Sequence, residues 1–197
     1  MLDSAGLHHV KIAASNQLDE HVIKSLQEQQ APIDIFGVGT SLVIGRPDGA
    51  LDGVYKLAQY RDKPRIKLSE NTAKMTLPGH KQVLRLYNSQ NQPIGADVVT
   101  LADETKPDSM LHPFEPFKSM DLHKLTAKPL LKPVMKAGQC CETQPTLKDI
   151  ADHVQFQLTQ MPQDYRRFDN PHEYKVGLSP GLKHQRDSLA QQLRRQA

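Results

Sequence analysis

The stretch 33–43, IDIFGVGTSLV, constrains the fold of this 197-residue chain more than any other. Its first half is a short apolar run, which is typical of a parallel strand covered on both faces. Gly37 and Gly39 break the run, and glycine lets a ligand come close to the main chain. Thr40 and Ser41 then offer hydroxyls suited to a helix start. The pattern predicts a strand and a turn that can hold an anion, although a GxG turn equally often serves backbone geometry.

The residues before this stretch supply a partner for the strand. Residues 9–14, HVKIAA, predict a short strand, and apolar residues at helical spacing predict a helix from Asn16 to about Gln29. Residues 2–6 are interpreted as the tail of a longer helix, and Gly6 is placed to end it. A strand, a helix and a second strand in this order form a right-handed βαβ unit. Such a unit belongs to a parallel sheet or a barrel, and we expect residues 1–52 to form part of an α/β barrel or sheet that carries the phosphate-binding loop.

The rest of the chain has a different pattern. Short runs of strand-forming residues, separated by polar turns, predict an antiparallel β-rich segment over residues 53–135. Apolar residues at helical spacing predict helices over about 146–161 and 180–195, within a helical segment 136–197. The predicted fold class is α/β: part of an α/β barrel, with an attached antiparallel β-rich segment and C-terminal helices.

Several polar side chains are candidates for the anion site. Asn16 follows the first predicted strand, so we expect it at the same sheet edge as the glycine turn, where ligands bind in α/β proteins. Capping the next helix is the alternative role of Asn16. Arg46 and Lys56 follow the turn, and for each the alternative is a solvated surface charge. The predicted phosphate-binding residues are Gly37, Val38, Gly39, Thr40 and Asn16, with Ser15, Lys56 and Arg46 as further candidates.

Composition argues against several classes of protein. The 25 basic and 22 acidic residues give a net charge of +3 without a long block of one sign, which disfavours a dedicated nucleic-acid binder. The two cysteines are adjacent and the nine histidines are scattered, so neither a disulfide framework nor a zinc site is expected. No apolar run approaches a membrane span, and the first residues lack a signal-peptide pattern. We expect a cytoplasmic protein without a nucleic-acid or membrane partner.

Ordered motifs along nearly the whole chain resemble those of nicotinate phosphoribosyltransferases. Motifs in this order and spacing are far more specific than any one of them alone. The resemblance implies an incomplete α/β barrel of the type II phosphoribosyltransferase kind, joined to a β-rich domain built from both chain ends. The motifs are KIAASNQLDE at 11–20, IDIFGVGT at 33–40, GVYKL at 53–57, PRIKLSE at 64–70, TLPG at 76–79 and NPHEYKVGLS at 170–179.

The resemblance also implies an activity. Enzymes of this family join nicotinate to phosphoribosyl pyrophosphate, coupled to ATP hydrolysis, and give nicotinate mononucleotide and pyrophosphate in NAD synthesis. By the same resemblance the amides of residues 37–40 hold the ribose 5′-phosphate, Asn16 lies at the neighbouring strand end, and ATP and Mg²⁺ take part.

Two motifs of the family have no counterpart in this sequence. One is a catalytic histidine in an early barrel strand, and the other is a strand with a Ser-Gly-Asp motif. We therefore expect a C-terminal portion that contains no catalytic residue and is inactive by itself. Its expected partner is the missing N-terminal half or a second copy. Two alternatives are a non-catalytic phosphate-binding or interaction module derived from that enzyme, and another barrel enzyme with a phosphate-binding loop.

Overall fold

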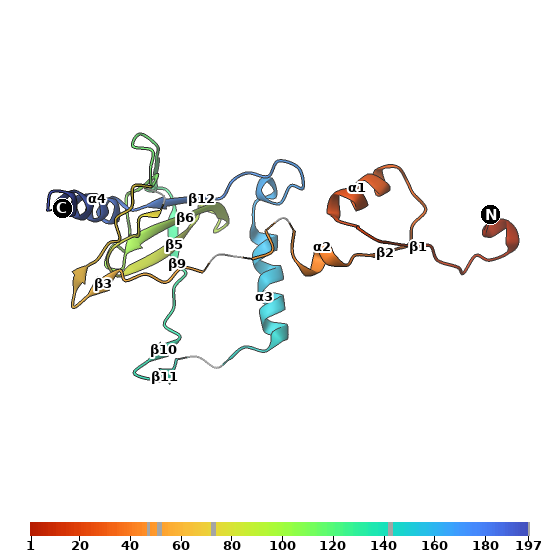
Figure 1. Ribbon diagram of the computed structural model, residues 1–197, viewed down its shortest axis with the longest axis horizontal. Coiled ribbons are helices and arrows are strands. Elements are labelled where there is room, and N and C mark those ends of the chain that lie inside the picture. The colour runs from red at the N-terminus through yellow and green to blue at the C-terminus, as the bar shows by residue number, and fades with distance from the viewer. Residues whose placement is uncertain (47, 51–52, 72–73, 142–143, 197) are drawn as a thin grey trace. The chain divides into compact units, whose positions relative to one another are not determined.

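The computed structural model divides into two compact units, Met1–Tyr55 and Lys56–Ala197 (Figure 1). The boundaries predicted after residues 52 and 135 stay predictions. The described residues are 1–46, 48–50, 53–71, 74–141 and 144–196.

The first unit contains two parallel strands joined through a helix. Ser15, at the end of the first strand, lies opposite Gly37, at the end of the second. The second strand runs into a glycine turn and a one-turn helix, so the predicted order of elements is confirmed. The elements are η1 (Asp3–Ala5), β1 (Ala13–Ser15), α1 (Glu20–Glu28), β2 (Ile35–Gly37) and α2 (Thr40–Val43).

Two details of this unit differ from the prediction. The helix α1 is capped by Asp19, whose Oδ1 accepts a hydrogen bond from the Val22 N–H at 2.8 Å. Asn16 is not the cap, because it has a left-handed φ of 83° and lies in the turn before the helix. The predicted burial of β2 on both faces is also wrong. Ile35 is 53% exposed, because the two-stranded ladder leaves its faces largely uncovered.

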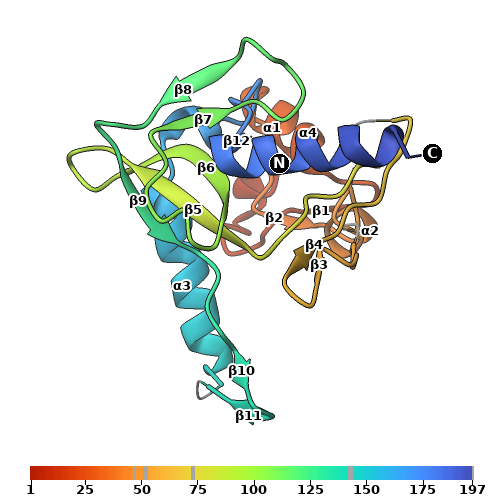
Figure 2. The same cartoon turned by 90° about the vertical axis from the view of Figure 1, so that its left-hand side faces the viewer.

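The second unit is built on a six-stranded mixed sheet in the order β8-β7-β12-β6-β5-β9 (Figure 2). β12 runs parallel to β6, and the other neighbouring pairs are antiparallel. One face of the sheet holds the apolar core, which includes Leu84, Leu86, Val98 and Met110. The strands are β5 (Lys81–Tyr87), β6 (Pro93–Leu101), β7 (Ser109–Leu111), β8 (Ser119–Asp121), β9 (Thr126–Pro129) and β12 (Lys175–Leu178).

The predicted β-rich character of this region is confirmed, although its first part contains little strand. Within residues 53–71 the strands are β3 (Gln59–Tyr60) and β4 (Lys63–Pro64), which form a small hairpin. Arg61 and Asp62 make its turn with positive φ angles. A second small hairpin joins β10 (Met135–Lys136) and β11 (Gln139–Cys140).

Both predicted C-terminal helices are confirmed. α3 (Leu147–Gln160) begins with a capping box in which the Thr146 side chain and the Asp149 side chain satisfy each other's backbone N–H groups. A short 3-10 helix, η3 (Gln163–Tyr165), follows. α4 (Pro180–Arg194) packs against β6 and β7, and it buries Leu182 completely.

The strand β12 was not predicted, because residues 136–197 were expected to be mainly helical. Its four residues are too few to show a period of two in the sequence. They nevertheless lie between β6 and β7 in the interior of the sheet. The C-terminal part of the chain therefore completes the sheet that the preceding residues begin.

Candidate functional site

A cavity of about 510 Å³ lies at the carboxyl ends of β1 and β2 in the first unit. Its position follows from the parallel pairing, which brings the last residues of both strands to one edge. Polar groups dominate the lining. The lining residues are Ser15, Asn16, Gln17, Leu18, Asp19, Gly37, Gly39, Thr40, Ser41 and Arg46.

Six of the eight predicted candidates line this cavity: Ser15, Asn16, Gly37, Gly39, Thr40 and Arg46. Val38 is half-buried and is not among the lining residues. Lys56 is exposed and begins the second unit, so it belongs to a separate body. The prediction missed Gln17, Leu18, Asp19 and Ser41, which adjoin predicted residues in the sequence.

Ser15 and Gly37 hold the floor of the cavity together. The Ser15 hydroxyl donates a hydrogen bond to the Gly37 carbonyl oxygen at 3.3 Å. A Cβ atom added to Gly37 would lie 3.2 Å from Ser15 Oγ, which is tighter than an ordinary contact. Glycine at this position therefore lets the two strand ends approach closely.

Gly39 lies on the open side of the same turn. A Cβ atom built on Gly39 would meet no heavy atom within 4 Å. Its carbonyl accepts hydrogen bonds from the N–H groups of Leu42 and Val43, both at 3.1 Å. The N–H groups of Thr40 and Ser41 come earlier in α2 and therefore have no partner inside the helix. They are donors beside an open, polar space.

Charge at the cavity is balanced between one cation and one carboxylate. Arg46 is exposed and supplies a guanidinium group with five donors. Asp19 supplies the carboxylate, and that group accepts the hydrogen bond that begins α1. Among the described residues, donors left for a ligand thus include the hydroxyls of Thr40 and Ser41, the N–H groups of the turn and Arg46, whereas the Ser15 hydroxyl already donates to Gly37. Such a set suits an anion with several acceptor oxygens.

Asp34 fixes the relative position of the two strands from their other end. Its Oδ2 accepts a hydrogen bond from the Ile12 N–H at 2.8 Å, and its Oδ1 lies 3.4 Å from Lys11 Nζ. The hydrogen bond from Ile12 and the charge of Lys11 lower the pKa of the Asp34 carboxyl. This carboxylate supports the strand pairing and does not line the cavity.

No group of three or more histidine, cysteine, aspartate or glutamate side chains able to hold a metal ion occurs within the described ranges. Over the same ranges, no helix combines the length and apolar character needed to cross a bilayer.

Comparisons with known proteins place the chain in a family. The family profile "Nicotinate phosphoribosyltransferase C-terminal domain" matches residues 80–186. The nicotinate phosphoribosyltransferase of Bacillus subtilis is 38% identical over 187 residues, which are 91% of this chain and 38% of that protein. The human enzyme of the same name is 33% identical over 89% of this chain and 33% of its own length.

A solved structure agrees with these sequence matches. The crystal structure of human nicotinic acid phosphoribosyltransferase is similar with a TM-score of 0.66 and 28% sequence identity, over 94% of this chain and 34% of that one. The chain thus spans about a third of the length of the relatives it matches. It belongs to the nicotinate phosphoribosyltransferase family and corresponds to the C-terminal portion of those enzymes.

Proposed function

We propose that this chain is the part of a nicotinate phosphoribosyltransferase that holds the 5′-phosphate of phosphoribosyl pyrophosphate. The whole enzyme joins nicotinate to that substrate and releases nicotinate mononucleotide and pyrophosphate, coupled to ATP hydrolysis. The observation that carries the proposal is the polar cavity at the ends of β1 and β2, together with membership of the family. In this proposal the first unit is one part of an α/β barrel.

The proposed phosphate site uses the glycine turn and the facing strand end. The N–H groups and hydroxyls of Thr40 and Ser41 donate to phosphate oxygens, and the open space beside Gly39 lets the phosphate approach the main chain. Asn16 donates from the neighbouring strand end. Arg46 adds the positive charge that a dianion requires. Val38 contributes its main chain, and Lys56 is a further candidate from outside the cavity lining.

Holding one end of a substrate does not by itself give catalysis. Orienting the second reactant contributes about 7–11 kcal/mol in favourable cases, and that orientation needs residues beyond this cavity. We assign no catalytic residue within this chain. The proposal therefore includes a partner that supplies the nicotinate site, either the N-terminal half of the enzyme or a second copy.

ATP and Mg²⁺ enter the proposal through the family resemblance. Mg²⁺ is commonly held by one or two carboxylates and by the phosphates of its substrate, so it needs no dedicated protein cage. We assign no Mg²⁺ ligand in this chain. No step of the proposed binding mode depends on the ion.

The test is reconstitution of the enzyme from two parts. The 197-residue chain is mixed with the N-terminal portion of the Bacillus subtilis relative, with nicotinate, phosphoribosyl pyrophosphate, ATP and Mg²⁺. Formation of nicotinate mononucleotide by the mixture, with none from the chain alone, is the expected result. Absence of product from a mixture that forms a stable complex would favour a non-catalytic module. Product from the chain alone would contradict the need for a partner.

A matched pair of glycine variants tests the phosphate site within that mixture. Gly39→Val fills the open space beside the turn, whereas Gly53→Val fills space that is equally open and lies outside the cavity lining. Gly39→Val is expected to raise KM for phosphoribosyl pyrophosphate at least about tenfold by blocking approach to the main chain. Gly53→Val should leave KM for phosphoribosyl pyrophosphate unchanged. Equal KM values in both variants would remove the turn from the site.

A further inference from the structure

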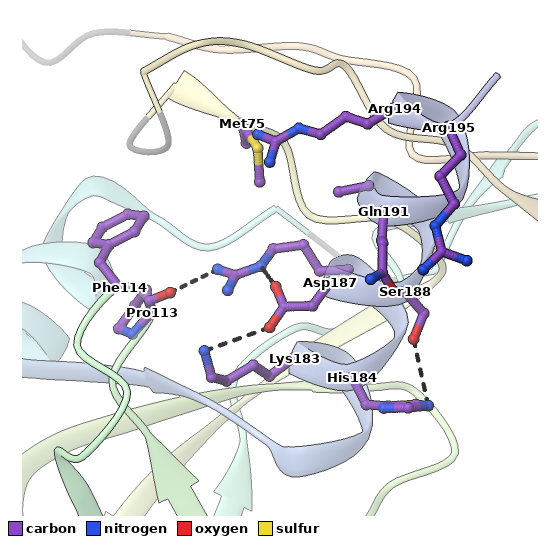
Figure 3. Close-up of a pocket in the computed structure, with 12 residues that line it drawn as sticks. Met75, Pro113, Phe114, Lys183, His184, Asp187, Ser188, Gln191, Arg194 and Arg195 are labelled. Carbon is purple, nitrogen blue, oxygen red and sulfur yellow. Dashed lines mark hydrogen bonds and ion pairs between the residues drawn. The ribbon is translucent and has the colours of Figure 1, made fainter. Parts of the chain in front are cut away.

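A large cavity in the second unit is not part of the proposed phosphate site. It has a volume of about 720 Å³ and runs along α4 (Figure 3). We call this cavity the α4 groove. Its lining residues are Met75, Pro113, Phe114, Lys183, His184, Arg186, Asp187, Ser188, Ala190, Gln191, Arg194 and Arg195.

The α4 groove has the length of a short extended peptide. Lys183 and Arg194 line its two ends and are eleven residues apart on one helix. At a rise of 1.5 Å per residue they are separated by about 16 Å. An extended chain covers about 3.3 Å per residue, so roughly five residues fit along the groove.

The wall opposite the helix is apolar and is held in place by fixed contacts. Phe114 is 51% exposed in this wall, and Pro113 lies beside it. The buried Arg186 donates from Nη1 to the Pro113 carbonyl oxygen at 2.8 Å. His112 Nδ1 accepts hydrogen bonds from the N–H groups of Phe114 and Glu115, at 3.2 and 2.9 Å. The wall is thus formed before any partner arrives, which reduces the entropy lost on binding.

The positive charge of the α4 groove is concentrated at the C-terminal end of the helix. In the middle, Asp187 pairs with Arg186 Nε at 2.7 Å and with Lys183 Nζ at 3.6 Å. Both cations are therefore paired with the same carboxylate, and the three groups together keep one net positive charge. Figure 3 shows the Lys183 and Asp187 side chains of this cluster. In the described part of the chain no carboxylate makes an ion pair with Arg194 or Arg195.

Arg194 and Met75 bring charge and an apolar surface together. In Figure 3 the Arg194 side chain reaches from the helix toward Met75. Arginine, methionine and phenylalanine are enriched at the centres of protein interfaces. An occupant that matches this groove carries carboxylates at the Arg194 end and apolar side chains against Met75 and Phe114.

This arrangement favours a peptide over a nucleic acid. A phosphate backbone places negative charge at regular intervals along its length, and it binds to a continuous row of cations. The α4 groove instead has the Asp187 carboxylate and the neutral Gln191 in its middle. A peptide can place apolar side chains there and keep its acidic residues at one end.

We propose that the α4 groove binds an acidic peptide segment of a partner protein, with its carboxylates on Arg194 and Arg195 and its apolar side chains against Met75 and Phe114. This proposal is independent of the phosphate site, since every lining residue lies in the second unit. The probe is a peptide selected from a random display library against the whole 197-residue chain.

The selected peptide is labelled with fluorescein, and its affinity is measured by anisotropy. Arg194→Gln together with Arg195→Gln is expected to weaken binding at least about tenfold, because both charged contacts are lost. Lys132→Gln together with Lys136→Gln makes the same change of charge on exposed residues outside the groove. That control should stay within about twofold of the unsubstituted chain. Phe114→Ala is expected to weaken binding without changing the charge.

Three results would overturn the proposal. The first is a selection that yields no peptide or yields peptides without acidic residues. The second is an equal loss of affinity in the groove and control variants, which would show attraction to net charge alone. The third is displacement of the peptide by millimolar inorganic phosphate at constant ionic strength, which would identify a small-anion site. Circular dichroism of each variant checks that the helix content is retained.

Discussion

Arg85 and Asp97 face each other across the β5–β6 ladder and form a two-pronged ion pair. Arg85 Nε lies 3.1 Å from Asp97 Oδ1, and Nη2 lies 3.2 Å from Oδ2. The Tyr174 hydroxyl donates to the same Oδ1 at 2.8 Å. Since Tyr174 directly precedes β12, this cluster ties the C-terminal strand to the central hairpin.

Asp97→Asn is expected to destabilise the second unit. The substitution keeps the side-chain shape but removes the charge that partners Arg85. We expect a loss of about 2 kcal/mol, below the roughly 3–5 kcal/mol typical of a fully buried pair, because 25% of the Arg85 side chain is exposed. Urea unfolding followed by circular dichroism measures the loss. Tyr174→Phe removes one hydrogen bond and should cost about 1 kcal/mol. A larger loss in Tyr174→Phe would contradict this ranking.

The stability of the same cluster is expected to fall in alkaline solution. Burial, followed by the hydrogen bond to Asp97, raises the pKa of Tyr174 in the folded chain above its ordinary value. Above pH about 10 the unfolded chain loses the phenolic proton while the folded chain retains it. The folded state then binds more protons, so its stability decreases as the pH rises.

An ultraviolet titration of tyrosinate absorbance checks this expectation. One of the five tyrosines should ionise only at a pH above the others or together with unfolding. Tyr174→Phe should remove that late step and reduce the alkaline loss of stability. A late step that persists in Tyr174→Phe would assign the shift to a different tyrosine.

Ser179→Ala is expected to lower the free energy of unfolding more than Thr146→Ala, the equivalent cap substitution at the start of α3. Ser179 is fully buried; its Oγ accepts from the Leu182 N–H at 3.2 Å and donates to Glu104 Oε2 at 2.5 Å. Its removal loses a helix cap and leaves a carboxylate oxygen with one donor fewer, a combined cost of about 2–3 kcal/mol.

Thr146→Ala is the matched control for that cap. Thr146 also begins a helix with its side chain, but its capping box is exposed to solvent. Water replaces the lost hydrogen bonds there, so the change in the urea midpoint should be clearly smaller. Equal midpoints for the two variants would show that the Glu104 contact adds nothing to the cap.

The sequence correctly predicted those elements that are determined by a few neighbouring residues. The glycine turn and the helix starts near residues 146 and 180 each depend on a few adjacent residues. The start of α1 was misplaced because Asn16 and Asp19 are both good caps. The positive φ of Asn16, set by the turn after β1, decides between them.

Long-range pairing was not predictable from these patterns. β12 has four residues, and nothing in them indicates that they lie between β6 and β7. The α4 groove depends on Met75, Phe114 and Arg194, which are far apart in the sequence. The grouping of Asn16 with the glycine turn was predictable, because strand ends followed by turns meet at one edge whenever two strands run parallel.

The interior position of β12 has a consequence for synthesis of the protein. Ribosomes make β5 to β9 first, and the slot between β6 and β7 stays empty until residues 175–178 follow. During that time two strands present unpaired edges, which are templates for association with other chains. A stop codon before residue 175 would make this state permanent. Loss of the last 23 residues should therefore lead to aggregation and degradation rather than to a shortened folded domain.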